Sequence, residues 1–98
     1  MNLFNITTPV DGAEMITELL QHKNVTINRI VSNRLTNGSW YDQDEDEWLV
    51  LVEGAALLLI DDEEKTLKAG DTLFIPAHQL HRVISTSDNA LWLTVHIS

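Results

Sequence analysis

The residues best suited to chemistry in this 98-residue chain are a carboxylate and an imidazole, Glu47 and His81. Glu47 directly precedes the apolar run 48–52, and side chains alternate between the two faces of a strand. If Leu49 and Leu51 face a core, Glu47 faces it too. A carboxylate in that place is costly unless it is paired or bound to a cation. A carboxylate together with an imidazole is a common ligand pair for Zn, Ni, Mn or Fe.

Other interpretations of these two residues stay open. Glu47 and His81 could form a purely structural pair, or Glu47 could bind Arg29, which falls on the apolar side of an earlier strand. Either residue could also serve as an acid–base group at the mouth of a pocket. We find no Ser–His–Asp arrangement, phosphate-cradling loop or dinucleotide-binding pattern that would direct the interpretation elsewhere.

Turn signals at short intervals divide most of the chain into segments typical of antiparallel β-structure. Glycine, asparagine and acidic clusters separate runs of four to eight apolar or alternating residues. The predicted strands span residues 25–32, 48–52, 57–60, 65–68, 72–75, 81–85 and 91–97. This spacing favours an antiparallel sandwich or barrel of seven or eight strands.

The segment before residue 24 shows a different pattern. Asp11 and Glu14 have the spacing of a capping box, in which each end of the motif satisfies a backbone N–H of the other. Four apolar residues then recur at helical spacing: Met15, Ile16, Leu19 and Leu20. We therefore predict one short amphipathic helix over residues 12–22, packed on the sheet.

The net charge, the cysteine content and the apolar segments of the sequence exclude several classes of partner and site. The net charge of −9 disfavours nucleic acid and anionic membrane surfaces as partners. The chain has no cysteine, which excludes disulfides, thiolate metal sites and a cysteine nucleophile. No apolar stretch approaches the ~20 residues of a membrane-spanning helix, and residues 1–9 lack the features of a signal peptide. We expect a single domain over residues 1–98 and a cytoplasmic location.

Two segments resemble the motifs of the cupin family. Residues 70–81, GDTLFIPAHQLH, match the second motif: Gly-Asp, a strand, Pro76 and a His five residues beyond it. Glu47, followed after six residues by Gly54, matches the end of the first motif. The resemblance covers residues 40–96. It implies an all-β, cupin-type double-stranded β-helix, or jelly-roll barrel, to which we add the short N-terminal helix.

The resemblance also implies a metal site, from which this sequence departs. In metal-binding cupins the residue at the position of His81 is a ligand, and a His-X-His pair precedes the position of Glu47. Here the pair's positions fall in residues 40–43, WYDQ, where Gln43 stands in place of the second histidine. Four residues form the predicted site for a divalent metal ion (Zn, Ni, Mn or Fe): Glu47, His81, Gln43 and Asp42. We expect His78 to line the mouth and His96 to be structural.

Two functions follow as hypotheses. The first is a cupin that binds a divalent metal and a small molecule in the barrel mouth, as a metal-dependent enzyme would. The alternative is a non-catalytic module that binds or senses a small ligand without metal, and the missing histidine pair favours it. The fold alone selects no substrate or reaction.

We also expect a homodimer, because a second copy can cover exposed strand edges and faces. Its predicted interface residues are Val25, Ile27, Ile30 and Val31.

Overall fold

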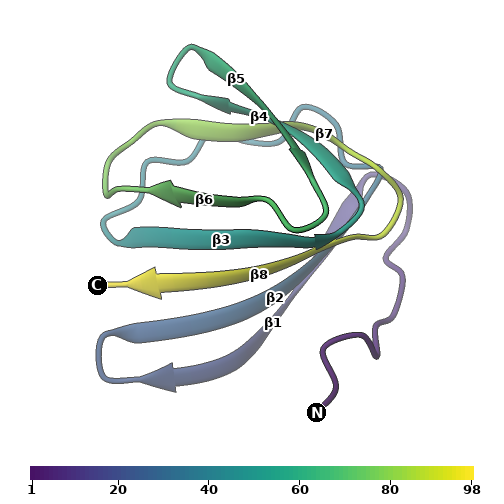
Figure 1. Ribbon diagram of the computed structural model, residues 1–98, viewed down its shortest axis with the longest axis horizontal. Coiled ribbons are helices and arrows are strands. Elements are labelled where there is room, and N and C mark those ends of the chain that lie inside the picture. The colour runs from purple at the N-terminus through teal and green to yellow at the C-terminus, as the bar shows by residue number, and fades with distance from the viewer.

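The computed structural model describes all 98 residues, as eight β-strands with no α-helix (Figure 1). The strands are β1 (Ala13–His22), β2 (Val25–Asn33), β3 (Asp46–Glu53), β4 (Ala55–Ile60), β5 (Glu63–Lys68), β6 (Thr72–Ile75), β7 (His81–Thr86) and β8 (Ala90–Ile97). They form a five-stranded sheet, in the order β1-β2-β8-β3-β6, and a three-stranded sheet, in the order β5-β4-β7. All pairings are antiparallel. The structure confirms the all-β jelly-roll architecture.

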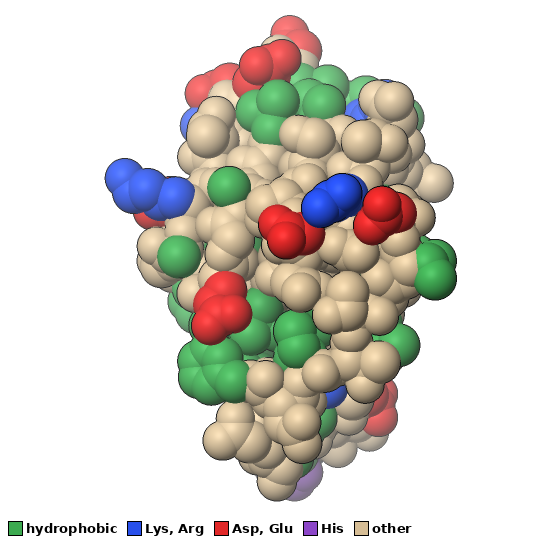
Figure 2. All heavy atoms as spheres, turned by 90° about the vertical axis from the view of Figure 1, so that its right-hand side faces the viewer, with side chains coloured by type: hydrophobic (Ala, Val, Ile, Leu, Met, Phe, Trp, Pro, Cys, Tyr) green, Lys and Arg blue, Asp and Glu red, His purple; other side chains and the backbone are tan.

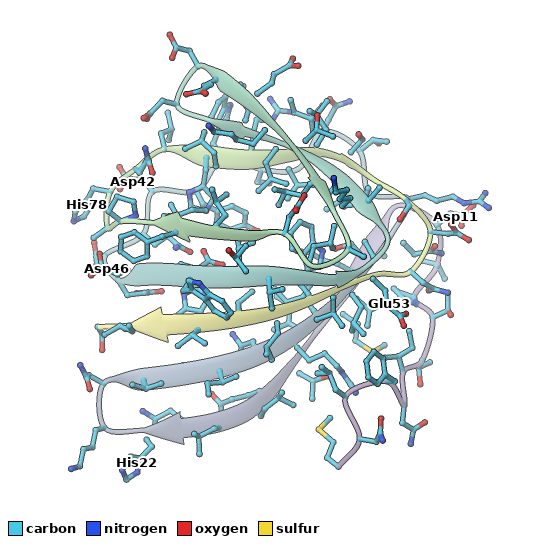
Figure 3. All side chains as sticks on the ribbon, viewed as in Figure 1. Asp11, His22, Asp42, Asp46, Glu53 and His78 are labelled. Carbon is cyan, nitrogen blue, oxygen red and sulfur yellow. The ribbon has the colours of Figure 1, made fainter.

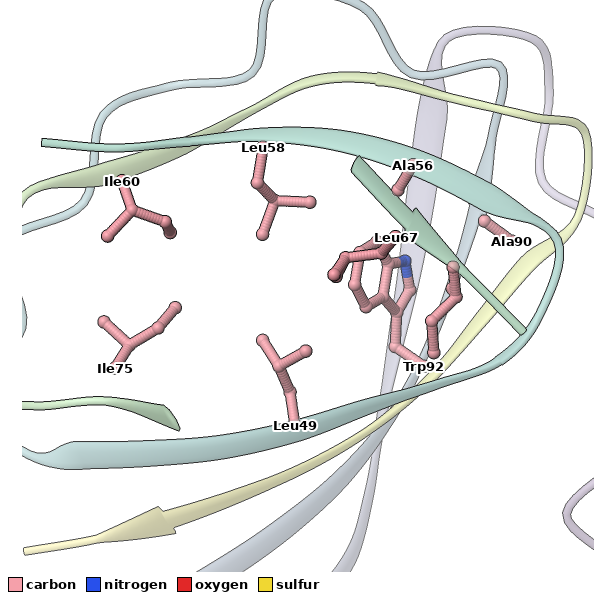
Figure 4. Packing of buried hydrophobic residues seen from close by; sticks show 9 residues of the cluster. Leu49, Ala56, Leu58, Ile60, Leu67, Ile75, Ala90 and Trp92 are labelled. Atoms are coloured by element: carbon pink, nitrogen blue, oxygen red, sulfur yellow. The ribbon is translucent and has the colours of Figure 1, made fainter. Parts of the chain in front are cut away.

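The two sheets meet in one apolar core (Figure 4). Alternate residues of each strand point inward, so Leu49 and Leu51 of β3 pack against Leu58 of β4. The cluster contains nine buried residues: Leu49, Leu51, Ala56, Leu58, Ile60, Leu67, Ile75, Ala90 and Trp92.

None of the elements of this fold is a helix of the length and hydropathy needed to span a membrane.

The helix predicted over residues 12–22 is wrong, because this segment forms β1 and pairs with β2. Met15 and Ile16 point to opposite faces of the sheet, as neighbours in a strand must. The register shifts between Glu18 and Leu20, which adds one residue to the strand as a β-bulge does. The bulge returns Leu20 to the face of Met15. Apolar residues interrupted in this way imitate the spacing of an amphipathic helix.

Two glycines allow tight connections between the strands. Gly54 alone joins β3 to β4 and has a φ of +92°, in the left-handed region that favours glycine. Gly70 has the same φ, and its N–H donates to the Leu51 carbonyl at 2.7 Å. The adjacent Asp71 accepts a hydrogen bond from the Lys68 N–H at 2.9 Å. The Gly-Asp pair of the second motif therefore attaches the β5–β6 turn to β3.

The two glycines provide a matched test of packing at the β3–β4 connection. A Cβ at Gly54 would lie 2.6 Å from Ser87 Oγ and 3.0 Å from Ala90 Cα, whereas a Cβ at Gly70 would meet no heavy atom within 4 Å. We expect Gly70→Ala to lower the free energy of unfolding by about 1 kcal/mol, through backbone strain alone. Gly54→Ala should lower it by about 2 to 3 kcal/mol, since overpacking is added. Urea denaturation measures both, and equal losses would contradict this account.

Candidate functional site

A cavity of about 240 Å³ lies between the two sheets. Its exposed rim includes Glu14, Ile16 and Tyr41, while Glu47 and His81 lie inside and are each only 7% exposed. The polar lining consists of Glu14, Asn28, Ser32, Tyr41, Gln43, Glu47, His81, Thr94 and His96. The remaining wall is apolar and consists of Ile16, Ile30, Leu49, Leu58, Ile75, Val83 and Trp92. The cavity thus joins an apolar wall to a few convergent polar groups, as small-molecule sites commonly do.

Glu47 is the central polar group of the cavity. The Gln43 side-chain amide donates to its Oε1 at 2.9 Å. His81 Nε2 lies 3.8 Å from the same oxygen, and His96 Nε2 lies 3.7 Å from Oε2. Both of these distances exceed hydrogen-bond length. The buried carboxylate therefore receives one hydrogen bond, and Oε2 receives none.

His81 is held in one orientation by its backbone surroundings. Its Nδ1 lies 2.8 Å from the Gln79 carbonyl, which can only accept a hydrogen bond, so Nδ1 carries the proton. In the neutral ring this leaves the lone pair of Nε2 facing Glu47. The ring of Tyr41 stacks on the imidazole, with 5.7 Å between ring centroids. Reciprocal backbone hydrogen bonds of 2.8 and 3.1 Å between Tyr41 and His81 hold the two residues together.

His96 belongs to the site, although the sequence indicated a structural role. It lies directly opposite Glu47 in the pairing of β8 with β3. Its Nδ1 is buried without a hydrogen-bond partner, and the nearest carboxylate is that of Glu45, at 3.4 Å. The sequence pattern that could have indicated this position is the alternation that puts His96 on one strand face with Trp92 and Thr94. The strand register, which the sequence does not specify, was needed to bring that face to Glu47.

Three of the four predicted metal ligands come together in the cavity. Glu47, His81 and Gln43 line it, but Gln43 presents an N–H donor to the carboxylate. Asp42 points outward and accepts a hydrogen bond from His78 Nδ1 at 2.8 Å, so neither of these residues lines the cavity (Figure 3). No group of three or more His, Asp or Glu side chains is arranged to hold a metal ion. In this arrangement the four predicted ligands therefore do not form a metal centre.

Arg29 does not reach Glu47. Arg29 lies opposite Leu93 and Thr17 on the outer face of the five-stranded sheet, whereas Glu47 points inward. The Arg29 guanidinium donates to the backbone carbonyls of Asn2, Leu3 and Asn5, at 3.1 to 3.4 Å. The alternative of a Glu47–Arg29 pair is therefore wrong, and Arg29 instead fastens the N-terminal segment onto the sheet.

A second polar group forms the rim on the side of β1. The Trp92 indole N–H donates to Ser32 Oγ at 3.2 Å, and the Ser32 hydroxyl donates to Glu14 Oε2 at 3.2 Å. Tyr41 also lies at the exposed rim of the cavity. Burial raises the pKa of its phenol, and the charges of Glu14 and Glu47 raise it further. Tyr41 therefore remains a protonated hydrogen-bond donor. The sequence suggested a helix cap for Glu14, and so missed this role.

Comparison with known proteins identifies the family of this fold and site. Residues 33–96, about two thirds of the chain, match the family described as the cupin domain. This chain is a cupin. A putative mannose-6-phosphate isomerase from Ralstonia eutropha JMP134 has 35% sequence identity to this cupin and a TM-score of 0.89, over 100% of this chain and 96% of the other. No curated protein matches the chain.

Two further solved structures share the fold at lower identity. An RmlC-like cupin from Shewanella frigidimarina NCIMB 400 is 19% identical, with a TM-score of 0.79 over 92% of this cupin and 80% of that chain. KdgF from Halomonas sp. is 16% identical, with a TM-score of 0.82 over 100% and 91% of the two chains. At these identities the similarity establishes the architecture alone.

The contact between His78 and Asp42, outside the cavity, predicts a pH-dependent contribution to stability. The hydrogen bond to Asp42 and its charge raise the pKa of His78, and Asp44 adds to the rise. A raised pKa stabilises the folded state below the unfolded pKa, and this contribution is lost as the pH rises through the folded pKa. We expect an NMR titration of His78 to have its midpoint above 6.5 and to return toward that value in Asp42→Asn. Asp62→Asn, at the β4–β5 turn, is the control. A wild-type midpoint at or below 6.5 would refute the prediction.

Proposed function

We propose that this cupin binds a small organic molecule in the cavity, with Glu47 as its polar anchor. The observation that carries the proposal is the state of Glu47, which is buried, receives one hydrogen bond and faces an apolar-walled cavity. Burying a carboxylate with so few partners costs free energy. A ligand that donates to Oε2 would recover part of that cost and place its apolar body against residues such as Leu58 and Ile75.

The same arrangement provides the elements of acid–base chemistry. Glu47 is an acceptor, and the neutral ring of His81 presents an Nε2 lone pair on the same side of the cavity. Either group could accept a proton from a ligand bound between them, provided the transferred proton lies within hydrogen-bond distance. We therefore place any catalytic activity at Glu47 and His81, with Gln43 as a positioning residue that orients the carboxylate.

A divalent metal is the second candidate occupant, and one observation favours it. Histidine ligands usually donate their other ring N–H to a carbonyl or carboxylate, as His81 does to Gln79. Glu47 and His81 would supply the first donors, with His96 beside them. Binding would require these side chains to rearrange, since no group of three is arranged for a metal ion.

A phosphorylated sugar, as in the name of the Ralstonia relative, is not the ligand that we propose. Phosphate sites in proteins usually contain arginine, lysine or a helix N-terminus. No lysine or arginine lines this cavity, and the chain contains no helix. Close relationship to that protein therefore supports a shared architecture, while the lining of this cavity favours another ligand.

We also propose a homodimer, formed through the outer face of the five-stranded sheet. Cross-strand partners on that face form a continuous apolar row across all five strands: Leu20, Ile27, Val95, Trp48 and Phe74. Phe74 is 55% exposed and Trp48 is 38% exposed. Contiguous exposed apolar surface of this kind marks interaction sites. Of the four residues expected from sequence, Ile30 lines the cavity, and Val31 lies on the outer face but is buried there. This leaves Val25 and Ile27 as partly exposed residues of the face.

Binding in the cavity predicts a specific effect of the isosteric substitution Glu47→Gln. In a thermal-shift screen of small molecules, we expect compounds that stabilise the wild type to bind Glu47→Gln about 10- to 100-fold more weakly, because a charged hydrogen-bond acceptor is lost. Calorimetric titration of the same compounds measures the dissociation constants. Glu53→Gln removes an equal charge at an exposed position outside the cavity and should leave them unchanged. Equal affinities in Glu47→Gln and wild type would overturn the proposal.

Metal analysis of the same preparations decides between the two occupants. Stoichiometric metal in protein purified without added metal, lost in Glu47→Ala and His81→Ala, would establish the second candidate. Folded protein that contains no metal would exclude the metal as the occupant and leave the organic ligand as the remaining candidate.

The dimer proposal predicts a monomer when charge is placed on the apolar row. We expect sedimentation equilibrium to give a dimer for the wild type and a monomer for Phe74→Glu, because a buried unpaired charge opposes association. Thr66→Glu, at an exposed position of β5 in the three-stranded sheet, is the control for added charge outside the proposed interface. A wild type that stays monomeric at high concentration would rule out the dimer.

A further inference from the structure

The cavity contains fixed negative charge without any fixed positive charge. Glu14 lies at its rim and Glu47 at its interior, and no lysine or arginine lines it. The chain as a whole carries a net charge of −9, and Figure 2 shows carboxylates gathered at the end of the molecule that carries β4 and β5. A concave site lined by one sign of charge raises the local concentration of ions of the opposite sign. The cavity therefore attracts cations.

Glu14 is held at the rim by a chain of directed hydrogen bonds. The Trp92 indole can only donate, so Ser32 Oγ must accept from it and use its own proton toward Glu14. Trp92 and Ser32 are 4% and 1% exposed, so this support is rigid although Glu14 itself is exposed. The arrangement needs an acceptor oxygen at Glu14. An ordinary surface glutamate would have no such connection to the buried core.

Both carboxylates act on the space between them. Glu14, Glu47 and Tyr41 line the same cavity. Burial raises the pKa of the Tyr41 phenol, and the charges of Glu14 and Glu47 raise it further. The ring of Tyr41 and that of Trp92 also present aromatic surface to the cavity. Aromatic rings attract cations through the negative charge of their faces. Charge and aromatic lining therefore favour the same type of ligand.

The apolar wall distinguishes an organic cation from a metal ion. The carboxylates do not converge into a group that could hold a metal. Between them the wall consists of hydrocarbon, including Leu49, Leu58 and Val83. A metal ion gains nothing from such a wall, whereas an organic ligand removes its own apolar surface from water there. The free Oε2 of Glu47 can accept one of the three hydrogens of an ammonium group.

We propose that the cavity selects a small organic cation, an ammonium group on a compact apolar body, over neutral and anionic molecules of the same shape. This inference rests on the proposed binding of a small molecule in the cavity and specifies the class of that molecule. Glu47 receives the ammonium group. Glu14, fixed through Ser32 and Trp92, provides the second charge that gives the selectivity.

Three probes that share one ring test the selectivity: cyclohexylmethylamine, cyclohexylmethanol and cyclohexanecarboxylate. Each is titrated into the full-length protein at pH 8 and low salt, and the NMR signal of the Trp92 indole N–H reports binding inside the cavity. We expect the amine to bind about 10-fold more tightly than the alcohol, and the carboxylate to bind more weakly than either. Added salt should weaken amine binding and leave alcohol binding unchanged.

Glu14→Gln and its control separate the role of the rim from that of the overall charge. Glu14→Gln keeps an oxygen acceptor for Ser32. It should weaken the binding of the amine about 3- to 10-fold and leave the binding of the alcohol unchanged. Glu18→Gln removes the same charge on the same strand, at a position that does not line the cavity, and should weaken amine binding less than Glu14→Gln does.

Each outcome of these titrations bears on a different claim. Alcohol or carboxylate binding as tightly as the amine would overturn the selectivity and leave the small-molecule function intact. Equal weakening by Glu14→Gln and Glu18→Gln would overturn the role of Glu14. If none of the probes moved the Trp92 signal, the proposed function would fail together with the inference.

Discussion

The pairing of β3 with β8 and β6 places a carboxylate inside the barrel, and the candidate site depends on that register. Glu47 lies opposite His96 on one side and Ile75 on the other. A slip of one residue would turn Glu47 to solvent and Trp48 toward the core. The pairing that buries Leu49 and Leu51 therefore also holds Glu47 in the cavity. Core packing supplies the free energy that keeps a poorly partnered carboxylate away from water.

The rest of the site is built on this frame by an irregular segment. Between β2 and β3, the backbone of residues 34–45 follows β7, with hydrogen bonds of 2.8 Å from Asn37 to Ile84 and from Gly38 to Val83. Those bonds carry Tyr41 over His81 and bring Gln43 to Glu47. The barrel is filled near the β3–β4 connection and hollow where this segment closes over it. Regular strand pairing thus places Glu47 inside the cavity, while the irregular segment 34–45 supplies Tyr41 at the rim.

Much of this arrangement could be predicted from sequence, where local pattern decides the structure. Turn signals between short apolar or alternating runs indicated strands β2 to β8, and alternation along β3 indicated the inward direction of Glu47. Contacts between distant segments decided the rest. The bulge in β1 disguised a strand as a helix, and with it the position of Glu14. Asp42 turns outward because His78, far along the chain, holds it. His96 joins the site only through the register of two strands.

A crystal structure of the protein soaked with cyclohexylmethylamine, recorded at wavelengths that reveal transition metals, would show what the cavity binds. We expect ligand density in the cavity, with the ammonium nitrogen within hydrogen-bond distance of Glu47 Oε2 and no anomalous peak beside it. An anomalous peak bound by Glu47 and His81 would contradict the account. So would a Glu47 side chain that points away from the cavity.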